Sequence, residues 1–291
     1  MKRFFSPELK LIFSMVVFGT IGVFVKNINL PSQEIALYRA LLASLLILGI
    51  LLLSKKKFSF KEIKKALPLL IISGVAIGFN WIFLFEAYKY TTVSVATLSY
   101  YFAPVIVTIA CPILFKEKFG VKEIICFVFS TIGIVLITGI GDLSNSSNHL
   151  LGVLFGLIAA VLYASVVLIN KFITVDGLYR TFFQFLSAVI VLTPYVIFTG
   201  GFTITTLNTN GFILLLIVGL VHTGITYYLY FTSIKELSGQ KTAILSYIDP
   251  LVAIILSVTL LAEELTLLQI IGGALILGFT LFYELSSKKQ K

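Results

Sequence analysis

Residues 100–124 read YYFAPVIVTIACPILFKEKFGVKEI, and residues 246–270 read SYIDPLVAIILSVTLLAEELTLLQI. Each stretch contains a proline-bearing apolar segment, a short polar connection and the beginning of a further apolar segment. An offset of 146 residues brings three positions into register: Tyr101 with Tyr247, Pro104 with Pro250, and Glu117 with Glu263. Self-similarity at one fixed offset predicts a fold built from related units.

The same relationship recurs near the start of each half of the chain. An offset of 145 residues places residues 16–20 (VVFGT) on residues 161–165 (VLYAS), and Lys26 on Lys171. Apolar helices match easily by chance, but here a proline, a glutamate and several helix ends agree on one shift. We therefore predict two related halves, residues 1–144 and residues 145–291.

The chain is too apolar for a soluble domain. Its mean hydropathy is +1.06 and only 12% of its residues are charged, whereas about a quarter are charged in typical soluble domains. Apolar stretches of about 18 or more residues predict membrane-spanning helices. The result is an all-α integral membrane fold with ten spans, roughly at 9–28, 34–54, 66–88, 92–115, 121–140, 150–171, 177–199, 210–232, 239–261 and 266–285.

Basic residues gather on one side of this ten-span plan. Of the 22 lysines and arginines, all but Lys26, Lys89 and Arg39 fall in the terminal segments and loops of that side. Because cytoplasmic loops carry an excess of basic residues, both termini are predicted to be cytoplasmic, in a multi-pass protein of the cell membrane. The net charge of +9 then indicates attraction to anionic lipid headgroups, so the lipid bilayer rather than nucleic acid is the expected partner.

Each half contains five spans, an odd number, so the second half is predicted to enter the membrane inverted. The loop charges agree with this prediction. The basic loop at residues 55–65 corresponds to residues 203–210, which carry no charge. Inverted repeats are typical of secondary transporters, in which the solute site lies near the midplane between the halves.

Two such halves resemble the EamA branch of the drug/metabolite transporter superfamily. In each, the fourth span contains a proline, a glutamate follows 13 residues later, and the last span is rich in glycine. The residues that carry this resemblance are Ala103-Pro104, Glu117 and Gly133, and then Asp249-Pro250, Glu263, Gly272-Gly273 and Gly278. The resemblance covers nearly the whole chain. It implies ten spans, cytoplasmic termini and a central cavity lined by spans 1, 3, 4, 6, 8 and 9.

Asp249 is the most informative single residue, because it lies near the middle of the ninth span. A carboxylate at that depth costs about 2.5–3.5 kcal/mol on insertion scales unless it is paired, hydrated or protonated. Its counterpart in the first half is Ala103, so the repeat does not require it. We expect either a solute or proton site in the cavity or a polar contact between helices. Pro104 and Pro250 each free a backbone carbonyl four residues earlier, on Tyr100 and Ser246. Each proline is predicted to be a hinge, to free a carbonyl that coordinates the solute, or to form a packed kink.

Other polar and aromatic side chains lie at comparable depth. His222 in the eighth span is either a proton-coupled group or a hydrogen-bonding contact between helices. Asn80 and Trp81 in the third span are candidates for the solute site, with simple packing as the alternative for Trp81. Tyrosine hydroxyls add further candidates, because a buried tyrosine usually finds a polar partner. These are Tyr100, Tyr101, Tyr227, Tyr228 and Tyr247, of which Tyr100 and Tyr247 lie nearest the two prolines.

Arg39 and Glu86 lie about one turn inside the predicted outer face. They form either a charged vestibule for a zwitterionic solute or ordinary interfacial contacts, with Arg39 snorkelling and Glu86 paired to Lys89. Glu117 and Glu263 are predicted to be structural, because each precedes a helix start, where negative charge complements the helix dipole. Residues 266–269 (TLLQ) are predicted to form a capping box.

The sequence contains neither an ATP-binding motif nor a cofactor site. Residues 239–242 (GQKT) fall short of a phosphate-binding loop, and Cys111 and Cys126 are expected to be free thiols without a metal. We therefore predict a protein that is not an enzyme: a secondary active transporter, and specifically an exporter, of small-molecule solutes such as amino acids. Efflux of drugs or other toxic compounds is the alternative. A monomer or a homodimer is equally compatible with the sequence.

Two other classes of protein are weaker interpretations. Residues 139–142 (GIGD) match a signature of intramembrane aspartyl proteases, with Asp249 as the second carboxylate. However, the signature falls at the outer end of a span, the partner Tyr-Asp motif is missing and the order of the motifs is reversed. A purely structural membrane protein is disfavoured because idle polar groups at the midplane are costly.

Overall fold

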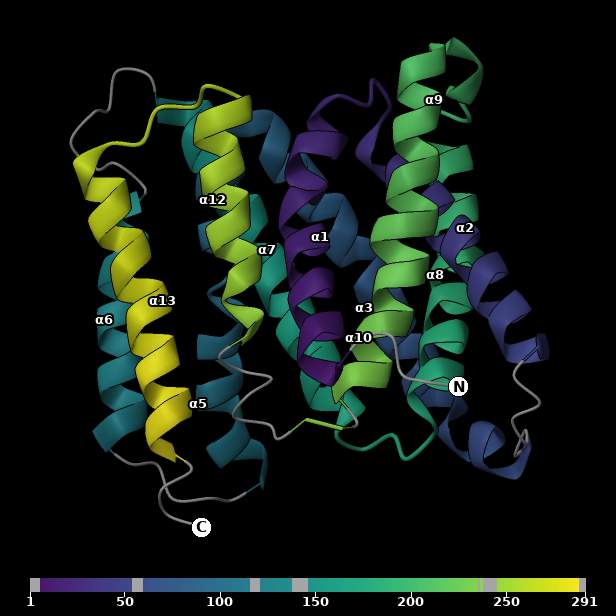
Figure 1. Ribbon diagram of the computed structural model, residues 1–291, viewed down its shortest axis with the longest axis horizontal. Helices are drawn as coiled ribbons and strands as arrows, with labels where there is room; N and C mark the ends of the chain where they lie inside the picture. Colours follow the sequence, from purple (N-terminus) through teal and green to yellow (C-terminus); the bar gives the residue numbers. More distant parts are fainter. Residues whose placement is uncertain are drawn as a thin grey trace.

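A computed structural model shows a bundle of helices (Figure 1) and describes residues 6–53, 60–115, 121–137, 146–234, 236–237 and 245–287. The first half contains α1 (Pro7–Lys26), α2 (Ser32–Leu53), α3 (Phe60–Tyr90), α4 (Val93–Tyr100), α5 (Ala103–Phe115) and α6 (Val121–Ile137). The second half contains α7 (Ser146–Asn170), α8 (Gly177–Thr199), η2 (Ile204–Thr206), α9 (Thr209–Leu216), the π-helical segment η3 (Ile217–Ile225), α10 (Thr226–Ile234), α12 (Ile248–Leu260) and α13 (Leu267–Ser287).

Length and hydropathy agree with the predicted membrane plan. Six of the described helical stretches are long and apolar enough to cross a membrane, and four shorter apolar helices stand where the remaining predicted spans lie. Large apolar side chains such as Leu53 and Phe198 are almost fully exposed on the outer surface of the bundle. Contact with lipid explains such exposure, because a soluble protein rarely leaves large apolar patches in water.

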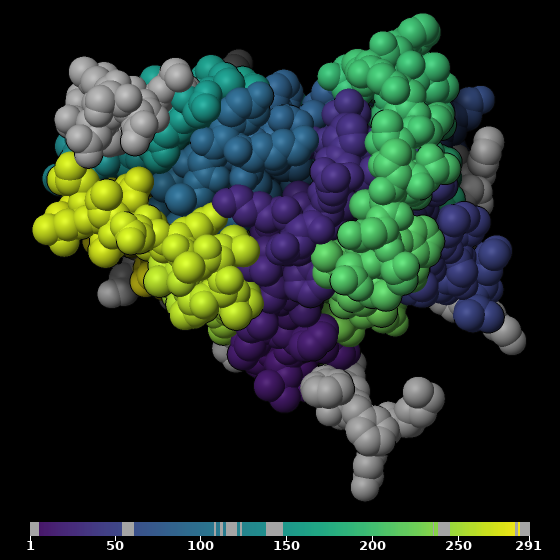
Figure 2. Space-filling model, turned by 90° about the horizontal axis from the view of Figure 1, so that it is seen from above, coloured from purple at the N-terminus to yellow at the C-terminus, as the bar shows by residue number. Residues whose placement is uncertain are grey.

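The helices of the two halves are interleaved rather than segregated. Figure 2 shows α1 between α12 and α13 on one side and the α9–α10 stretch on the other. The main contacts between the halves are α3 with α7 and α8, α4 with α7, α1 with α10 and α12, α2 with η3, and the pairs α2–α8 and α6–α13. Exchanging every span for its counterpart in the other half reproduces this set of contacts. The contacts between the halves therefore follow the correspondence that the sequence repeat predicts.

The fourth and ninth spans differ from their predicted form. The sequence predicts a hinge or a packed kink at each proline. In the structure the helix is interrupted at Tyr101–Phe102 and at Tyr247, shortly before each proline. Pro104 and Pro250 instead stand in the first turns of α5 and α12. The physical reason is that proline lacks an N–H, and only in a first turn does the helix not need that donor.

The eighth span also differs, because its centre is π-helical rather than α-helical. In η3 the Thr223 hydroxyl donates to the carbonyl oxygen of Val218, five residues earlier, at 2.8 Å. The Thr226 hydroxyl makes the same kind of bond to Val221 at 2.7 Å. Such π-helical insertions are rare and frequently accompany functional sites.

The capping box predicted at the start of the last span is confirmed. The Thr266 N–H donates to Gln269 Oε1 at 3.0 Å, and the Gln269 N–H donates back to Thr266 Oγ1 at 3.2 Å. Glu117, residues 139–142 and residues 239–242 lie outside the described residues, so the predictions made for them stay sequence predictions.

Candidate functional site

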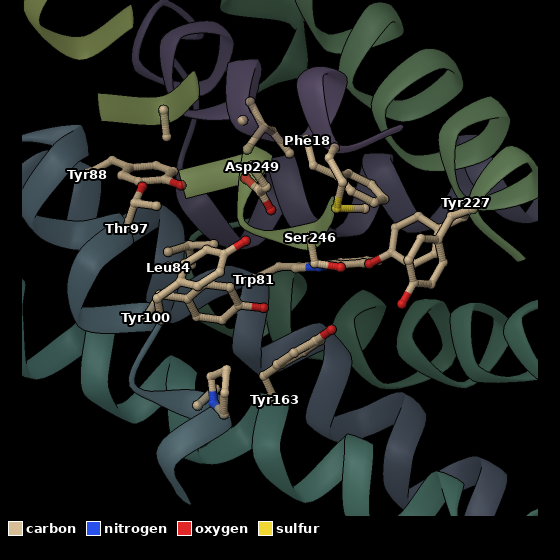
Figure 3. A pocket seen from close by; sticks show the side chains of 18 of the residues that line it. Phe18, Trp81, Leu84, Tyr88, Thr97, Tyr100, Tyr163, Tyr227, Ser246 and Asp249 are labelled. Atoms are coloured by element: carbon tan, nitrogen blue, oxygen red, sulfur yellow. The ribbon is translucent and has the colours of Figure 1, made fainter. Parts of the chain in front are cut away.

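A cavity of about 200 Å³ lies between the two halves (Figure 3). Its walls come from α1, α3, α4, α5, α7, α10 and α12, which belong to the expected spans 1, 3, 4, 6, 8 and 9. The second span contributes as well, through Arg39. The residues with polar or aromatic side chains in the lining are Phe18, Arg39, Trp81, Tyr88, Thr97, Tyr100, Tyr101, Tyr163, Tyr227, Tyr230, Ser246 and Asp249.

Asp249 stands in the first turn of α12 and lines the cavity (Figure 3). Its carboxylate is hydrogen-bonded by the hydroxyl of Tyr101, from the break between α4 and α5. Gly19 of α1 makes this geometry possible, because a Cβ there would stand only 2.5 Å from the Asp249 carbonyl oxygen. The two helix breaks and one glycine thus place a carboxylate inside the membrane beside the neutral hydroxyl of Tyr101.

One interpretation of the sequence is that Arg39 snorkels toward the outer face, but the structure does not show this. Its side chain is buried, its Nε donates to Thr223 Oγ1 at 2.5 Å, and its guanidinium lies 4.2 Å from the centre of the Trp81 ring. The ring of Phe85 lies 5.6 Å away. A cation over aromatic faces gains electrostatic attraction, so these contacts hold the charge inward. Arg39 belongs to the cavity lining rather than to an outer vestibule.

The aromatic walls form pairs across the cavity. The rings of Tyr100 and Tyr163 are 5.4 Å apart between centroids, and those of Phe18 and Tyr227 are 5.1 Å apart. Both distances are within the range of favourable aromatic contacts. In Figure 3, Tyr100, Tyr163, Tyr227 and Asp249 surround one space.

Several lining residues of one half have a counterpart in the other half that also lines the cavity. The repeat could therefore be used to predict further lining residues. Tyr88, Thr97, Tyr163 and Tyr230 line the cavity without having been predicted. At the offset of 145 residues, Tyr163 is the counterpart of Phe18, which also lines the cavity. At 146 residues the lining pairs are Trp81 with Tyr227, Leu84 with Tyr230, Tyr100 with Ser246, and Ala103 with Asp249. Corresponding positions of the two halves therefore meet at the cavity.

Asn80 was assigned to the solute site but lies elsewhere. Its Nδ2 donates to the carbonyl oxygen of Ala159 at 2.6 Å and is buried between α3 and α7. Neighbouring positions on a helix point in different directions, so Trp81 reaches the cavity while Asn80 faces a neighbouring helix. Asn80 is thus a contact between the halves.

His222 also lies away from the cavity lining. Its Nε2 is 2.7 Å from Thr20 Oγ1 of α1, and its Nδ1 is 3.3 Å from the carbonyl oxygen of Ile217. Both ring nitrogens are therefore engaged: the Nε2 contact holds η3 against α1, and the Nδ1 contact lies within η3 itself. Tyr247 and Pro250, next to the cavity in sequence, are not among its lining residues either.

A second, wider cavity of about 1000 Å³ lies at the end of α1 and α3. Glu86 is in its wall, and its carboxylate accepts from Lys89 Nζ at 2.9 Å, as the three-residue spacing predicted. Tyr88 lines both this outer cavity and the central one. Its side chain is therefore the partition between them.

Glu263 links several helices at the end of the bundle where this wider cavity lies. Its carboxylate pairs with Lys26 Nζ, accepts from the Ser257 hydroxyl, and accepts from the Val93 N–H at 2.8 Å. It was expected to favour the start of the last span, but it caps α4 of the other half instead. The reason is that α12 ends beside the beginning of α4. One side chain thus ties α1, α4 and α12 together.

A model of the EamA-like transporter family matches residues 6–139 and 150–284, one match in each half. The chain therefore belongs to the EamA-like transporter family, and it is a multi-pass transporter of the cell membrane. The resemblance stated from the sequence is confirmed.

Individual relatives agree with this family. The chain is 33% identical over 274 residues to the uncharacterized transporter YxxF of Bacillus subtilis, covering 93% of this chain and 87% of the relative. It is 28% identical over 296 residues to the uncharacterized inner membrane transporter YicL of Salmonella typhimurium, covering 97% and 96%. A solved crystal structure superposes with a TM-score of 0.66 at 16% identity, covering 94% of this chain and 95% of the other. That likeness bears on the fold alone.

Proposed function

We propose that this protein is a secondary active exporter of small zwitterionic metabolites, amino acids first among them. The observation that carries the proposal is the central cavity, several of whose lining residues form pairs of corresponding positions from the two halves. A site on the axis between two inverted halves can face either side of a membrane when the halves tilt. The cavity also contains one basic and one acidic side chain, Arg39 and Asp249.

The size of the cavity favours metabolites over drugs. Sites for drug-sized ligands have volumes of about 300–1,000 Å³, whereas this cavity has about 200 Å³. Because the cavity volume lies below that range, a small amino acid suits the cavity better than a drug-sized compound. Efflux of bulky toxic compounds would require a substantially wider state.

The mechanism we propose is alternating access about the central cavity. Closure at the end formed by α1, α4 and α12 is supported by Glu263 and its partners, with Tyr88 as the partition toward the outer cavity. Opening requires this closure to part, and the breaks before α5 and α12 give the spans places to bend. The basic-residue asymmetry of the sequence assigns this closed end to the outside of the cell.

Transport by a panel of radiolabelled solutes into inverted membrane vesicles tests the proposal. We expect uptake of amino acids that depends on an ion or solute gradient and needs no ATP, in vesicles that contain the protein. Overexpression should also raise the tolerance of cells to toxic amino-acid analogues. Uptake that requires ATP, or uptake of bulky cationic drugs but of no amino acid, would contradict the proposal.

A further inference from the structure

In the part of the chain that the structure describes, Arg39 has no anionic partner. Among the described residues its only hydrogen bond runs from Nε to Thr223, and its other contacts are the faces of Trp81 and Phe85. The ion pairs of the described residues join Lys26 to Glu263 and Lys89 to Glu86, and neither includes Arg39. The side chain is nevertheless only 4% exposed. A buried charge is ordinarily paired.

The contacts of Arg39 orient it as a receptor. Nε is held by Thr223, whose hydroxyl is itself fixed on the Val218 carbonyl by the π-helical geometry of η3. The guanidinium carbon lies 4.2 Å from the centre of the Trp81 ring, so the ring restricts where the guanidinium can move. The terminal Nη groups have no partner among the described residues, and the residue lines the central cavity. A planar pair of donors of this kind matches the two oxygens of a carboxylate or a phosphate.

We infer that Arg39 binds an oxyanion of the transported solute, which in an amino acid is the α-carboxylate. The inference rests on the proposed transport function and assigns a binding residue to it. Asp249, held by Tyr101 in the same cavity, then faces the ammonium group. The remaining volume between the tyrosine rings holds the side chain of the solute. Trp81 and Thr223 are positioning residues, because they act on the solute through Arg39.

The test compares solutes that differ by one charged group. Purified protein in liposomes is given radiolabelled L-leucine, 3-methylbutylamine, which lacks the carboxylate, and 4-methylpentanoate, which lacks the amine. The panel is extended with other amino acids, 2-oxo acids and phosphate monoesters. For the best oxyanion-bearing solute, removal of the carboxylate or phosphate should abolish exchange. Preference for phosphate esters over carboxylates would identify phosphate as the bound group.

Variants at position 39 test whether Arg39 causes the preference for solutes that carry an oxyanion. Arg39→Gln should raise the KM for the oxyanion solute roughly 10- to 100-fold, the range expected for a lost hydrogen bond to a charged group. Arg39→Lys should keep the preference for the anion at a weaker KM, because it retains charge but not the planar donor pair. The matched control is Arg180→Gln. Arg180 lies 5.7 Å from the Phe231 ring but outside the cavity lining, so this change should leave KM unaltered.

Thermal unfolding of each variant in detergent separates loss of binding from loss of folding. If folded Arg39→Gln protein exchanges the oxyanion solute with the wild-type KM, the inference is wrong. It is equally wrong if the wild type carries the amine as well as the amino acid, or carries only solutes without an oxyanion. In those cases transport itself still stands. Absence of flux for every member of the panel, neutral and cationic solutes included, would refute the transport function instead.

Discussion

At the scale of single residues, the depth of a residue in the membrane could be predicted from the sequence, but the direction in which its side chain points could not. Trp81 and Asn80 are neighbours in the third span, and only Trp81 lines the cavity. Asp249 was found because a carboxylate in an apolar span is conspicuous. Tyr163 and Tyr230 lie in apolar helices that contain other aromatic residues. Only their correspondence to lining residues of the first half marks them as cavity residues.

Asp249→Asn should reduce flux at least tenfold while leaving the protein folded. The substitution keeps the shape of the side chain and its hydrogen bond with Tyr101 but removes the charge that we assign to the solute ammonium. A lost hydrogen bond to a charged group is worth about 1.5–3 kcal/mol, which corresponds to a tenfold or greater change in affinity. Exchange kinetics in liposomes measure it.

Asn80→Leu is the control for a buried polar residue outside the cavity. It removes the bond from Nδ2 to the Ala159 carbonyl, and bonds of this kind between membrane helices are worth about 0.6 kcal/mol on average. We expect slightly lower thermal stability with an unchanged KM. Wild-type flux in Asp249→Asn, or an equal rise in KM in both variants, would assign Asp249 a packing role.

At the scale of elements, local rules succeeded where the residues involved are adjacent in sequence. The capping box of α13 is such a case, because Thr266 and Gln269 satisfy each other. The π-helical η3 could not be foreseen, since its bonds depend on packing against α1 and α2. The role of Glu263 was also out of reach, because its partner Val93 is 170 residues away.

The crossing of α6 and α13 depends on a glycine pair. A Cβ on Gly272 would stand 2.6 Å from the carbonyl oxygen of Gly133, whereas a Cβ on Gly278 of the same helix meets nothing within 4 Å. Gly272→Ala should therefore lower stability by about 1–3 kcal/mol through overpacking. Gly278→Ala should be neutral or raise stability by up to about 1 kcal/mol, because alanine favours the helix. Thermal unfolding in detergent distinguishes them, and equal effects would exclude the close crossing.

Breaking the Glu263 closure should expose the central cavity to the outside. Ala253→Cys in a background without Cys111 and Cys126 places a thiol in the cavity wall. Glu263→Gln removes the charge that ties α1, α4 and α12 together. We expect a cationic, impermeant thiol reagent added to intact cells to label position 253 roughly five- to tenfold faster in this variant, which corresponds to about 1 kcal/mol of lost closure.

Glu86→Gln provides the comparison for that experiment. It breaks an ion pair at the same end of the molecule, but one made within α3 alone. Labelling at position 253 should therefore not accelerate. If both variants label at the wild-type rate, Glu263 does not hold the cavity closed.

At the scale of the whole molecule, the all-helical membrane fold, the transporter family and the membrane location could be predicted from hydropathy, charge and the repeat. Those signals are spread over many residues and do not depend on any one contact. The interleaving of the halves was not foreseen in detail, because it is set by which faces pack together. In Figure 1, α1 begins and α13 ends on the same lower side, as an even number of crossings requires. Which side faces the cytoplasm stays a prediction from the charges.

Single cysteines test that sidedness. Lys65 in the first turns of α3 and Thr206 in η2 are both exposed, and they belong to the corresponding segments 55–65 and 203–210. In a background without Cys111 and Cys126, an impermeant reagent on intact cells should label Thr206→Cys and spare Lys65→Cys. Permeabilised cells should label both. Labelling of position 65 alone would reverse the topology.

Exchange of labelled solute by purified protein in liposomes tests the central claim most directly. The claim is that the central cavity between the halves carries a small zwitterion across the membrane by alternating access. Without ATP, unlabelled amino acid inside the liposomes should draw in its labelled form, and Asp249→Asn and Arg39→Gln should both suppress this exchange. An absence of exchange across a broad solute panel, with wild-type protein shown to be folded, would contradict the account.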